Sequence, residues 1–244
     1  MRMTRCYVDL PLRTGTRVAL PDATANHLAR VLRLREGDAC VLFNGDGHDH
    51  GGRIITISKR EVVVELGDAR AVETESPLHV TLLQGIARGE KMDLILQKAT
   101  ELGVAAIIPV LAERTEVKLD AERTEKRVAH WRSVIASACE QSGRARLPTL
   151  AAPAALNDAA RAIDGDAMRL TLDPAGAVSL ATVQVATGAV VVAIGPEGGW
   201  SPRDRQALAA AGFQGLQLGP RVLRTETAGL AAIAAVQARL GDLG

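Results

Sequence analysis

Short runs that alternate apolar and polar positions occupy the first third of the chain, and turn residues separate them. Such runs predict β-strands. We expect strands at residues 5–8, 16–19, 39–43, 53–57 and 61–66. One helix is expected from residue 23 to about 32, capped by Asp22 and with Leu28, Val31 and Leu32 facing inward. Short strands at close spacing indicate a small β-barrel over residues 1–71.

A different pattern follows the polar stretch at residues 68–77, which we interpret as a linker. Apolar strand segments now alternate with helical segments. The expected strands are residues 79–84, 105–110, 168–172, 190–194 and 216–219, and the expected helices are 90–102, 124–139, 156–162, 202–211 and 225–240. The first helix would bury Leu94, Ile95, Ala99 and Leu102, and Ser201 with Asp204 would cap the fourth. This alternation predicts an α/β domain with a mostly parallel sheet over residues 76–244.

Composition narrows the class of protein. No apolar run approaches the roughly 20 residues that span a bilayer, and no signal peptide is visible. The three cysteines, Cys6, Cys40 and Cys139, lie far apart, which is typical of buried thiols in a reducing compartment, so we expect a cytoplasmic protein. The net charge of +1 is not the basic excess of many nucleic-acid binders, so any electrostatic contact with RNA must be local.

One group of residues invites a metal site. His48 and His50 stand beside Asp46 and Asp49. They belong to a glycine-rich hairpin tip, and no third cluster of ligand residues stands at a recognised spacing. We therefore expect no metal.

The candidate chemistry begins after the apolar run at 190–194. A glycine loop follows it directly, Gly195-Pro196-Glu197-Gly198-Gly199-Trp200-Ser201. Ligands of open α/β sheets bind beyond the carboxyl ends of such strands, and glycine lets a ligand approach the backbone closely. An ordinary tight turn would use the same glycines, so the loop alone leaves both interpretations open. The chain has no G-x-G-x-x-G, P-loop or G-x-S-x-G motif, which argues against a dinucleotide-binding oxidoreductase and an α/β-hydrolase.

A second loop stands at residues 218–228, Leu-Gly-Pro-Arg-Val-Leu-Arg-Thr-Glu-Thr-Ala. Thr225 can cap the helix that follows. Arg221 and Arg224 stand close to Glu226, which fits either an exposed ion pair at a helix start or arginines that hold a phosphate or polarise a base. Glu226 fits either a helix-start carboxylate or a catalytic group.

These two loops, together with residues 97–104 (Gln-Lys-Ala-Thr-Glu-Leu-Gly-Val) and 140–144 (Glu-Gln-Ser-Gly-Arg), resemble the SPOUT class of S-adenosylmethionine-dependent RNA methyltransferases, and within it the RsmE type. The resemblance spans nearly the whole chain. It implies a PUA-like β-barrel that binds RNA, followed by a SPOUT domain with a C-terminal trefoil knot. It also implies a homodimer that methylates N3 of a uridine in small-subunit (16S) ribosomal RNA, a substrate we expect within the assembled 30S particle.

The resemblance assigns site residues in three groups. Contacts to S-adenosylmethionine are expected from Leu172, Ile194, Gly195, Pro196, Glu197, Gly198, Gly199, Leu218, Gly219, Val222, Leu223 and Thr225. The candidate catalytic residues are Arg221, Arg224, Glu197 and Glu226. The candidate RNA contacts are Arg5, Arg30, Arg33, Lys98, Arg114 and Arg144. Asp173 departs from the family pattern, which more often has histidine before the proline at this point.

Two other functions stay open on the sequence. One is a SPOUT enzyme that methylates a ribose 2′-hydroxyl of ribosomal or transfer RNA. The other is a non-catalytic assembly factor that binds RNA and keeps a vestigial pocket. The product nucleoside separates the first alternative from uridine methylation, and donor binding separates the second.

Overall fold

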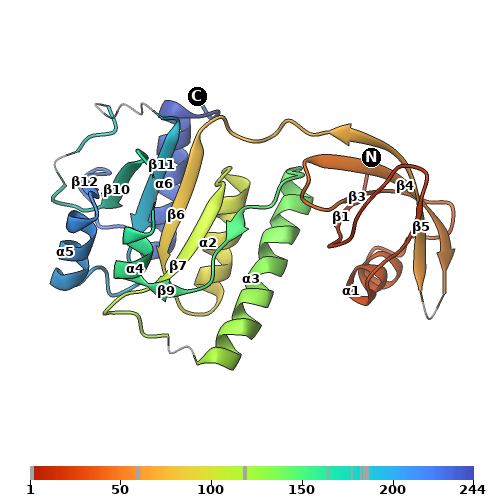
Figure 1. Cartoon of the computed structure of the whole chain (residues 1–244), viewed down its shortest axis with the longest axis horizontal. Helices are drawn as coiled ribbons and strands as arrows, with labels where there is room; N and C mark the ends of the chain where they lie inside the picture. The colour runs from red at the N-terminus through yellow and green to blue at the C-terminus, as the bar shows by residue number, and fades with distance from the viewer. Residues whose placement is uncertain are drawn as a thin grey trace. The chain divides into compact units, whose positions relative to one another are not determined.

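The computed structural model describes residues 3–58, 61–117, 120–163, 165–176, 178–181, 183 and 187–244. The chain divides into two compact units, each described by itself (Figure 1). Unit 1 is Met1–Glu75 with Ala136–Leu147, and unit 2 is Ser76–Ile135 with Pro148–Gly244. Residues 136–147 thus join unit 1, although they lie within the sequence range expected for the second domain. No helix of the described residues is long and apolar enough to cross a membrane.

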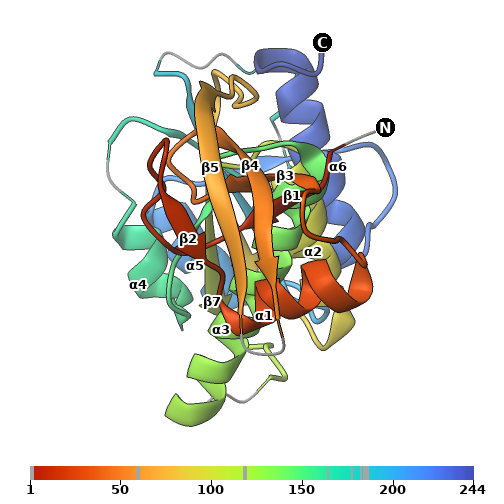
Figure 2. The same cartoon turned by 90° about the vertical axis from the view of Figure 1, so that its right-hand side faces the viewer.

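Unit 1 contains a five-stranded sheet in the order β1-β3-β4-β5-β2. Its strands are β1 (Arg5–Tyr7), β2 (Arg17–Ala19), β3 (Ala39–Phe43), β4 (His48–Ile57) and β5 (Val62–Ala71). Figure 2 shows β4 and β5 as a long curved pair. All five expected strands are present, but β4 begins earlier and β5 ends later than expected. The residues from His48 to Gly52 are polar or glycine and have weak strand propensity, so the sequence did not predict a strand there. They belong to the sheet because they pair with β5.

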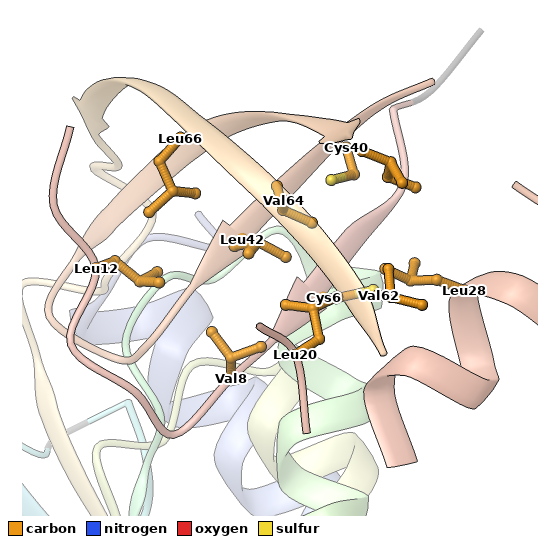
Figure 3. Packing of buried hydrophobic residues seen from close by; sticks show 11 residues of the cluster. Cys6, Val8, Leu12, Leu20, Leu28, Cys40, Leu42, Val62, Val64 and Leu66 are labelled. Carbon is orange, nitrogen blue, oxygen red and sulfur yellow. The ribbon is translucent and has the colours of Figure 1, made fainter. Parts of the chain in front are cut away.

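The core of unit 1 gathers buried apolar side chains from β1, β3, β4, β5 and the helical segment, and Val18 of β2 packs against them (Figure 3). Cys6 and Cys40 belong to this cluster as free thiols. Burial raises the pKa of Cys40 to about 11, so the thiol stays protonated at neutral pH. These cysteines are therefore packing residues.

The helical segment of unit 1 corrects the expected helix in two ways. It splits into α1 (Asp22–Asn26) and the π-helix η1 (His27–Val31), in which the Leu32 amide donates to the His27 carbonyl oxygen at 3.0 Å. The extra residue in the turn rotates later side chains by about 100° from their α-helical directions. Leu28 is buried as expected, but Val31 and Leu32 are 66% and 40% exposed. Asp22 is not the cap, because Pro21 occupies that position.

Unit 2 contains a seven-stranded sheet that is parallel throughout its described pairings. Its main order is β12-β10-β11-β6-β7-β8, and β9 also pairs with β7. The strands are β6 (His79–Gly85), β7 (Ala106–Leu111), β8 (Thr149–Leu150), β9 (Ala154–Ala155), β10 (Met168–Leu172), β11 (Ala189–Ile194) and β12 (Gln214–Leu216). The predicted parallel α/β sheet is confirmed. Strand β12 ends at Leu216, where the expected strand began, because the main-chain pairs with β10 involve residues 214–216.

The helices are α2 (Glu90–Glu101), α3 (Ala121–Ser142), α4 (Leu156–Arg161), α5 (Pro202–Ala210) and α6 (Thr225–Leu240). The predicted capping box of α5 is confirmed, with the Ser201 side chain accepting from the Asp204 amide and the Asp204 carboxylate accepting from the Ser201 amide. In α2, Ile95 and Ala99 are buried as expected, whereas Leu94 is 40% exposed. Helix α6 packs against α2, β6 and β11, and Figure 1 shows it behind the strands. The chain therefore returns from the edge strand β12 to the middle of the sheet through residues 217–224.

Candidate functional site

A cavity of about 500 Å³ lies at the carboxyl ends of β10 and β11. Its walls are the glycine loop after β11, the residues after β10, and residues 217–224 before α6, which we call the return segment. All twelve residues expected to contact the methyl donor line it, and so do the four candidate catalytic residues. The volume lies within the range of small-molecule pockets in proteins, roughly 300–1,000 Å³. Apolar walls beside charged groups suit a nucleoside that carries a charged tail. The individual roles of these residues stay predictions.

Close backbone packing shapes the glycine loop. A Cβ atom on Gly85, the last residue of β6, would lie 2.5 Å from the Pro196 nitrogen. A Cβ atom on Gly195 would lie 3.2 Å from the Gly199 Cα. Gly199 has a φ of +62°, and its amide donates to the Pro196 carbonyl oxygen at 2.8 Å. The glycines therefore let this loop pack closely against itself and against β6. This packing is a structural reason for glycine here, in addition to the expected access of a ligand to the backbone.

A buried chain of hydrogen bonds connects the loop to β6 and α6. The Thr225 hydroxyl donates to the Gly195 carbonyl oxygen at 2.6 Å and accepts from the Gln84 side-chain amide at 3.1 Å. The same Gln84 nitrogen donates to the Gly85 carbonyl oxygen at 2.8 Å. Thr225 is not the helix cap that the sequence suggested, because Arg224 holds that position. Sequence reasoning missed Gln84, whose one signal is a polar side chain directly after the apolar residues Leu82 and Leu83 of β6.

Glu197 joins the glycine loop to the turn before α2. Its Oε1 atom accepts from the Arg88 amide at 3.0 Å and lies 3.4 Å from the Lys91 ammonium. Burial of the Glu197 carboxyl acts to raise its pKa. The hydrogen bonds from the Arg88 amide, its own amide and Lys91, together with the charge of Lys91, outweigh burial and lower the pKa below its ordinary value. Glu197 is therefore held as an anion, which suits holding the loop better than accepting a proton near neutral pH.

Glu226 has a different environment in the first turn of α6. Its Oε2 atom is buried and has no hydrogen-bond partner among the described residues. The preceding cap, Arg224, makes no side-chain capping bond. Arg221 and Arg224 are exposed along the same loop, and Val222 between them is 83% exposed. The return segment and the first turn of α6 thus bring two exposed guanidinium groups and a buried carboxylate oxygen to one cavity.

Comparisons with known proteins identify the family of the chain. A family model described as an RNA methyltransferase domain matches residues 74–237, and a second, described as an RNA methyltransferase PUA domain, matches residues 20–67. A ribosomal RNA small subunit methyltransferase E from Neisseria gonorrhoeae, crystallised with S-adenosylmethionine, is 41% identical with a TM-score of 0.95 over 100% of both chains. The chain belongs to the ribosomal RNA small subunit methyltransferase E family.

Two further relatives support this assignment. A methyltransferase from Legionella pneumophila, also crystallised with S-adenosylmethionine, is 38% identical with a TM-score of 0.96 over 100% of both chains. The family member from Mycobacterium bovis is 33% identical over 94% of this chain and 89% of its own length. The predicted fold class is confirmed: a PUA-like domain precedes an α/β methyltransferase domain with a parallel sheet. The trefoil knot stays a prediction.

The residues expected to contact RNA in this family fall into different environments. In unit 2, the Arg114 guanidinium donates to the Gly198 carbonyl oxygen at 3.0 Å, so Arg114 is both exposed and attached to the pocket loop. Lys98 pairs with Glu101 of the same helix at 2.8 Å. In unit 1, Arg30 and Arg33 are exposed beside Val31 and Leu32.

Arg5 and Arg144 of unit 1 are each paired with an acidic side chain. The Arg5 guanidinium pairs with Asp49 at 2.7 Å, donates to the Cys139 carbonyl oxygen at 2.9 Å and lies over the Phe43 ring. The Arg144 side chain is 4% exposed and pairs with Glu75. Both side chains make contacts within unit 1, and their expected role as RNA contacts stays a prediction. Each carboxylate partner lies far from its arginine along the chain, so the sequence pattern did not indicate these pairs.

Several pocket residues were not expected from the resemblance. Lys91, Trp200 and Arg205 line the cavity, as does Asp173, whose departure from the family pattern was the one available signal. The Trp200 indole donates to the Thr171 hydroxyl at 2.9 Å, which fixes the ring in the cavity wall. Among the described residues, no three His, Cys, Asp or Glu side chains are arranged to hold a metal ion.

Proposed function

We propose that this protein transfers a methyl group from S-adenosylmethionine to N3 of a uridine in small-subunit ribosomal RNA. The observation that carries the proposal is the cavity of about 500 Å³ bounded by the glycine loop and the return segment. The names of the relatives supply the class of RNA, and the two relatives crystallised with the donor supply the cofactor. Their chains align with this one over its full length.

The chain's own residues suit binding of the donor. Apolar side chains, Leu172 and Ile194 among them, provide walls for the adenine, and the backbone of the glycine loop provides donors and acceptors. S-adenosylmethionine, when bound, supplies an electrophilic methyl group on a sulfonium sulfur. The return of the chain through residues 217–224 supports the trefoil knot that we propose for this domain.

Transfer to N3 of uridine also requires loss of the N3 proton. We assign the proton acceptor to Glu226, because its Oε2 atom is buried and free of partners among the described residues. Arg221 and Arg224 are placed to stabilise the negative charge that develops on the uracil oxygens. Glu197 is assigned to holding the glycine loop rather than to proton transfer.

The partner assignments complete the proposal. Residues 1–71, which include Arg30 and Arg33, form a PUA-like domain that contributes RNA contacts, and residues 76–244 form the methyltransferase domain. Arg114 and Lys98 add RNA contacts in the second domain. The working form is a homodimer, and the substrate is ribosomal RNA within the 30S particle in the cytoplasm.

The test is methyl transfer from labelled S-adenosylmethionine to unmodified small ribosomal subunits, followed by identification of the labelled nucleoside by mass spectrometry. Labelled 3-methyluridine is expected. A ribose-methylated product would overturn the assignment of N3 as the reacting atom, and absence of donor binding would favour an assembly factor.

The roles of the two carboxylates are tested by a matched pair of substitutions. Glu226→Gln should lower the transfer rate roughly 100-fold or more and leave donor affinity within a few-fold. Glu197→Gln should chiefly weaken donor binding.

A further inference from the structure

Asp173 and Arg205 form an ion pair in the wall of the cavity. Asp173 directly follows β10, and Arg205 belongs to α5. The Arg205 guanidinium lies 2.5 Å from the Asp173 Oδ2 atom. Both residues line the cavity, and their side chains are 27% and 50% exposed. An ion pair this exposed contributes little to stability, roughly 0–1 kcal/mol. Its place in the pocket wall therefore calls for a reason beyond stability.

The Asp173 carboxylate is held before any ligand arrives. Its Oδ1 atom accepts from the Ala175 amide at 3.0 Å, and its Oδ2 atom meets Arg205. A carboxylate oxygen accepts more than one hydrogen bond, and a guanidinium has five N–H groups, of which this contact uses one. The pair therefore presents an anion and a cation side by side, with acceptor and donor capacity left for a ligand. Groups already in place lose little entropy on binding.

Lys91 and Glu197 form another ion pair in the cavity, and its carboxylate has a different set of contacts. The Glu197 Oε1 atom already accepts from the Arg88 amide. The Glu197 carboxylate thus connects the glycine loop to the backbone at Arg88. The side chains of Asp173 and Arg205 instead contact each other at the cavity wall. Leu172, the neighbour of Asp173, belongs to the apolar wall. An apolar surface next to a paired anion and cation matches a nucleoside that continues into a zwitterion.

We propose that Asp173 and Arg205 recognise the amino-acid end of the methyl donor, with Asp173 accepting from its α-ammonium and Arg205 donating to its α-carboxylate. The inference rests on the proposed use of S-adenosylmethionine. It assigns specificity for the donor to two side chains outside the glycine loop and the return segment. A charged group that leaves water needs an opposite charge in the site, and this pair supplies one for each end of the zwitterion.

The test compares three ligands by isothermal titration calorimetry on the full chain. S-adenosylmethionine and S-adenosylhomocysteine both carry the zwitterion, and only the first carries the sulfonium charge. Methylthioadenosine keeps the adenosine and lacks the amino-acid end. Asp173→Asn and Arg205→Gln should each weaken both zwitterionic ligands about tenfold or more, and leave methylthioadenosine within about twofold. Arg203→Gln is the control, because Arg203 lies in the same helix, is 86% exposed at its side chain, and is not part of the cavity wall.

Four outcomes would overturn the inference. Equal weakening of all three ligands would give the pair a structural or ribose-binding role, and weakening of S-adenosylmethionine alone would assign Asp173 to the sulfonium. Unchanged affinities in both variants would remove the pair from recognition, while normal binding by the wild type would leave the proposed function standing. Wild-type protein that binds none of the ligands would overturn both. Thermal melting of each variant shows whether the fold persists, and Asp173→Asn keeps the oxygen that accepts from Ala175.

Discussion

The hydroxyl of Thr225 donates to the carbonyl oxygen of Gly195 at 2.6 Å, so the first residue of the last helix is bonded to the loop that opens thirty positions earlier. Gln84 of β6 donates to the same hydroxyl. One side chain thus connects the glycine loop, helix α6 and the central sheet. The shape of the cavity depends on all three.

Removing this hydroxyl should loosen the cavity. Thr225→Ala leaves the Gly195 carbonyl oxygen and the Gln84 amide without this partner, and we expect a loss of about 1–3 kcal/mol in the free energy of unfolding. Donor affinity should fall as well, because the glycine loop loses its connection to α6. Urea unfolding and calorimetric titration measure the two effects. Thr225→Ser keeps the hydroxyl and should behave more like the wild type. Equal losses in both variants would point to the methyl group instead.

A second anchor of α6 lies far from the cavity. Gln237 is buried, accepts from the Ser76 hydroxyl at 2.8 Å and donates to the Leu102 carbonyl oxygen at 3.0 Å. Gln237→Leu should lower the free energy of unfolding by about 1–3 kcal/mol, because buried polar partners lose their bonds. Donor affinity at a temperature where the variant is folded should not change, since Gln237 does not line the cavity. Arg239→Ala, an exposed change in the same helix, should leave stability within about 0.5 kcal/mol. A large effect of Arg239→Ala would show that the helix responds to any substitution.

The lowered pKa of Glu197 leads to a prediction for the free energy of unfolding at acidic pH. Its pKa in the folded protein lies below the ordinary value of 4.5, so the folded state binds the proton more weakly than the unfolded state. The contribution of Glu197 to stability is therefore present above pH 4.5 and is lost as the pH falls through the lower folded pKa. The stability difference between wild type and Glu197→Gln should be full near pH 7 and shrink below pH 4.5. Chemical unfolding across this range measures it, and a difference that stays constant with pH would contradict the ion pair with Lys91.

Gly85 should tolerate no side chain. The Cβ atom of Gly85→Ala would lie 2.5 Å from the nitrogen and 2.6 Å from the Cδ atom of Pro196, so the glycine loop would have to move. We expect donor affinity to fall at least tenfold and the melting temperature to drop. Gly67→Ala is a matched control, because its new Cβ atom would lie 3.5 Å from the nearest heavy atom, which is ordinary contact. Normal donor binding by Gly85→Ala would show that the loop position is not required for the pocket.

Much of the parallel sheet could be predicted because its strands carry a strong local signal. The run at 190–194 is apolar without interruption, as expected of a strand with neighbours on both sides, and β11 covers it. The capping box at Ser201 and Asp204 is equally local, since its partners are three residues apart. The π-helical turn after Asn26 has no such signal, so Val31 and Leu32 were placed on the wrong face.

In the candidate site as well, features with a local sequence signal could be predicted, and features that depend on distant residues could not. The glycine loop at 195–201 and the second loop at 218–228 could be recognised from the sequence, and the structure places both around one cavity. A backbone that packs closely requires glycine, which is why the first loop shows in the sequence. Local sequence carries no information about which distant side chain will neutralise a charge. Only the tertiary structure turned Arg5 and Arg144 inward to Asp49 and Glu75, and brought Arg205 to Asp173. The sequence by itself determined the kind of sheet and where its loops open. The folded chain decided which charges pair and which remain for a ligand, because ion pairing depends on distances between residues far apart along the chain.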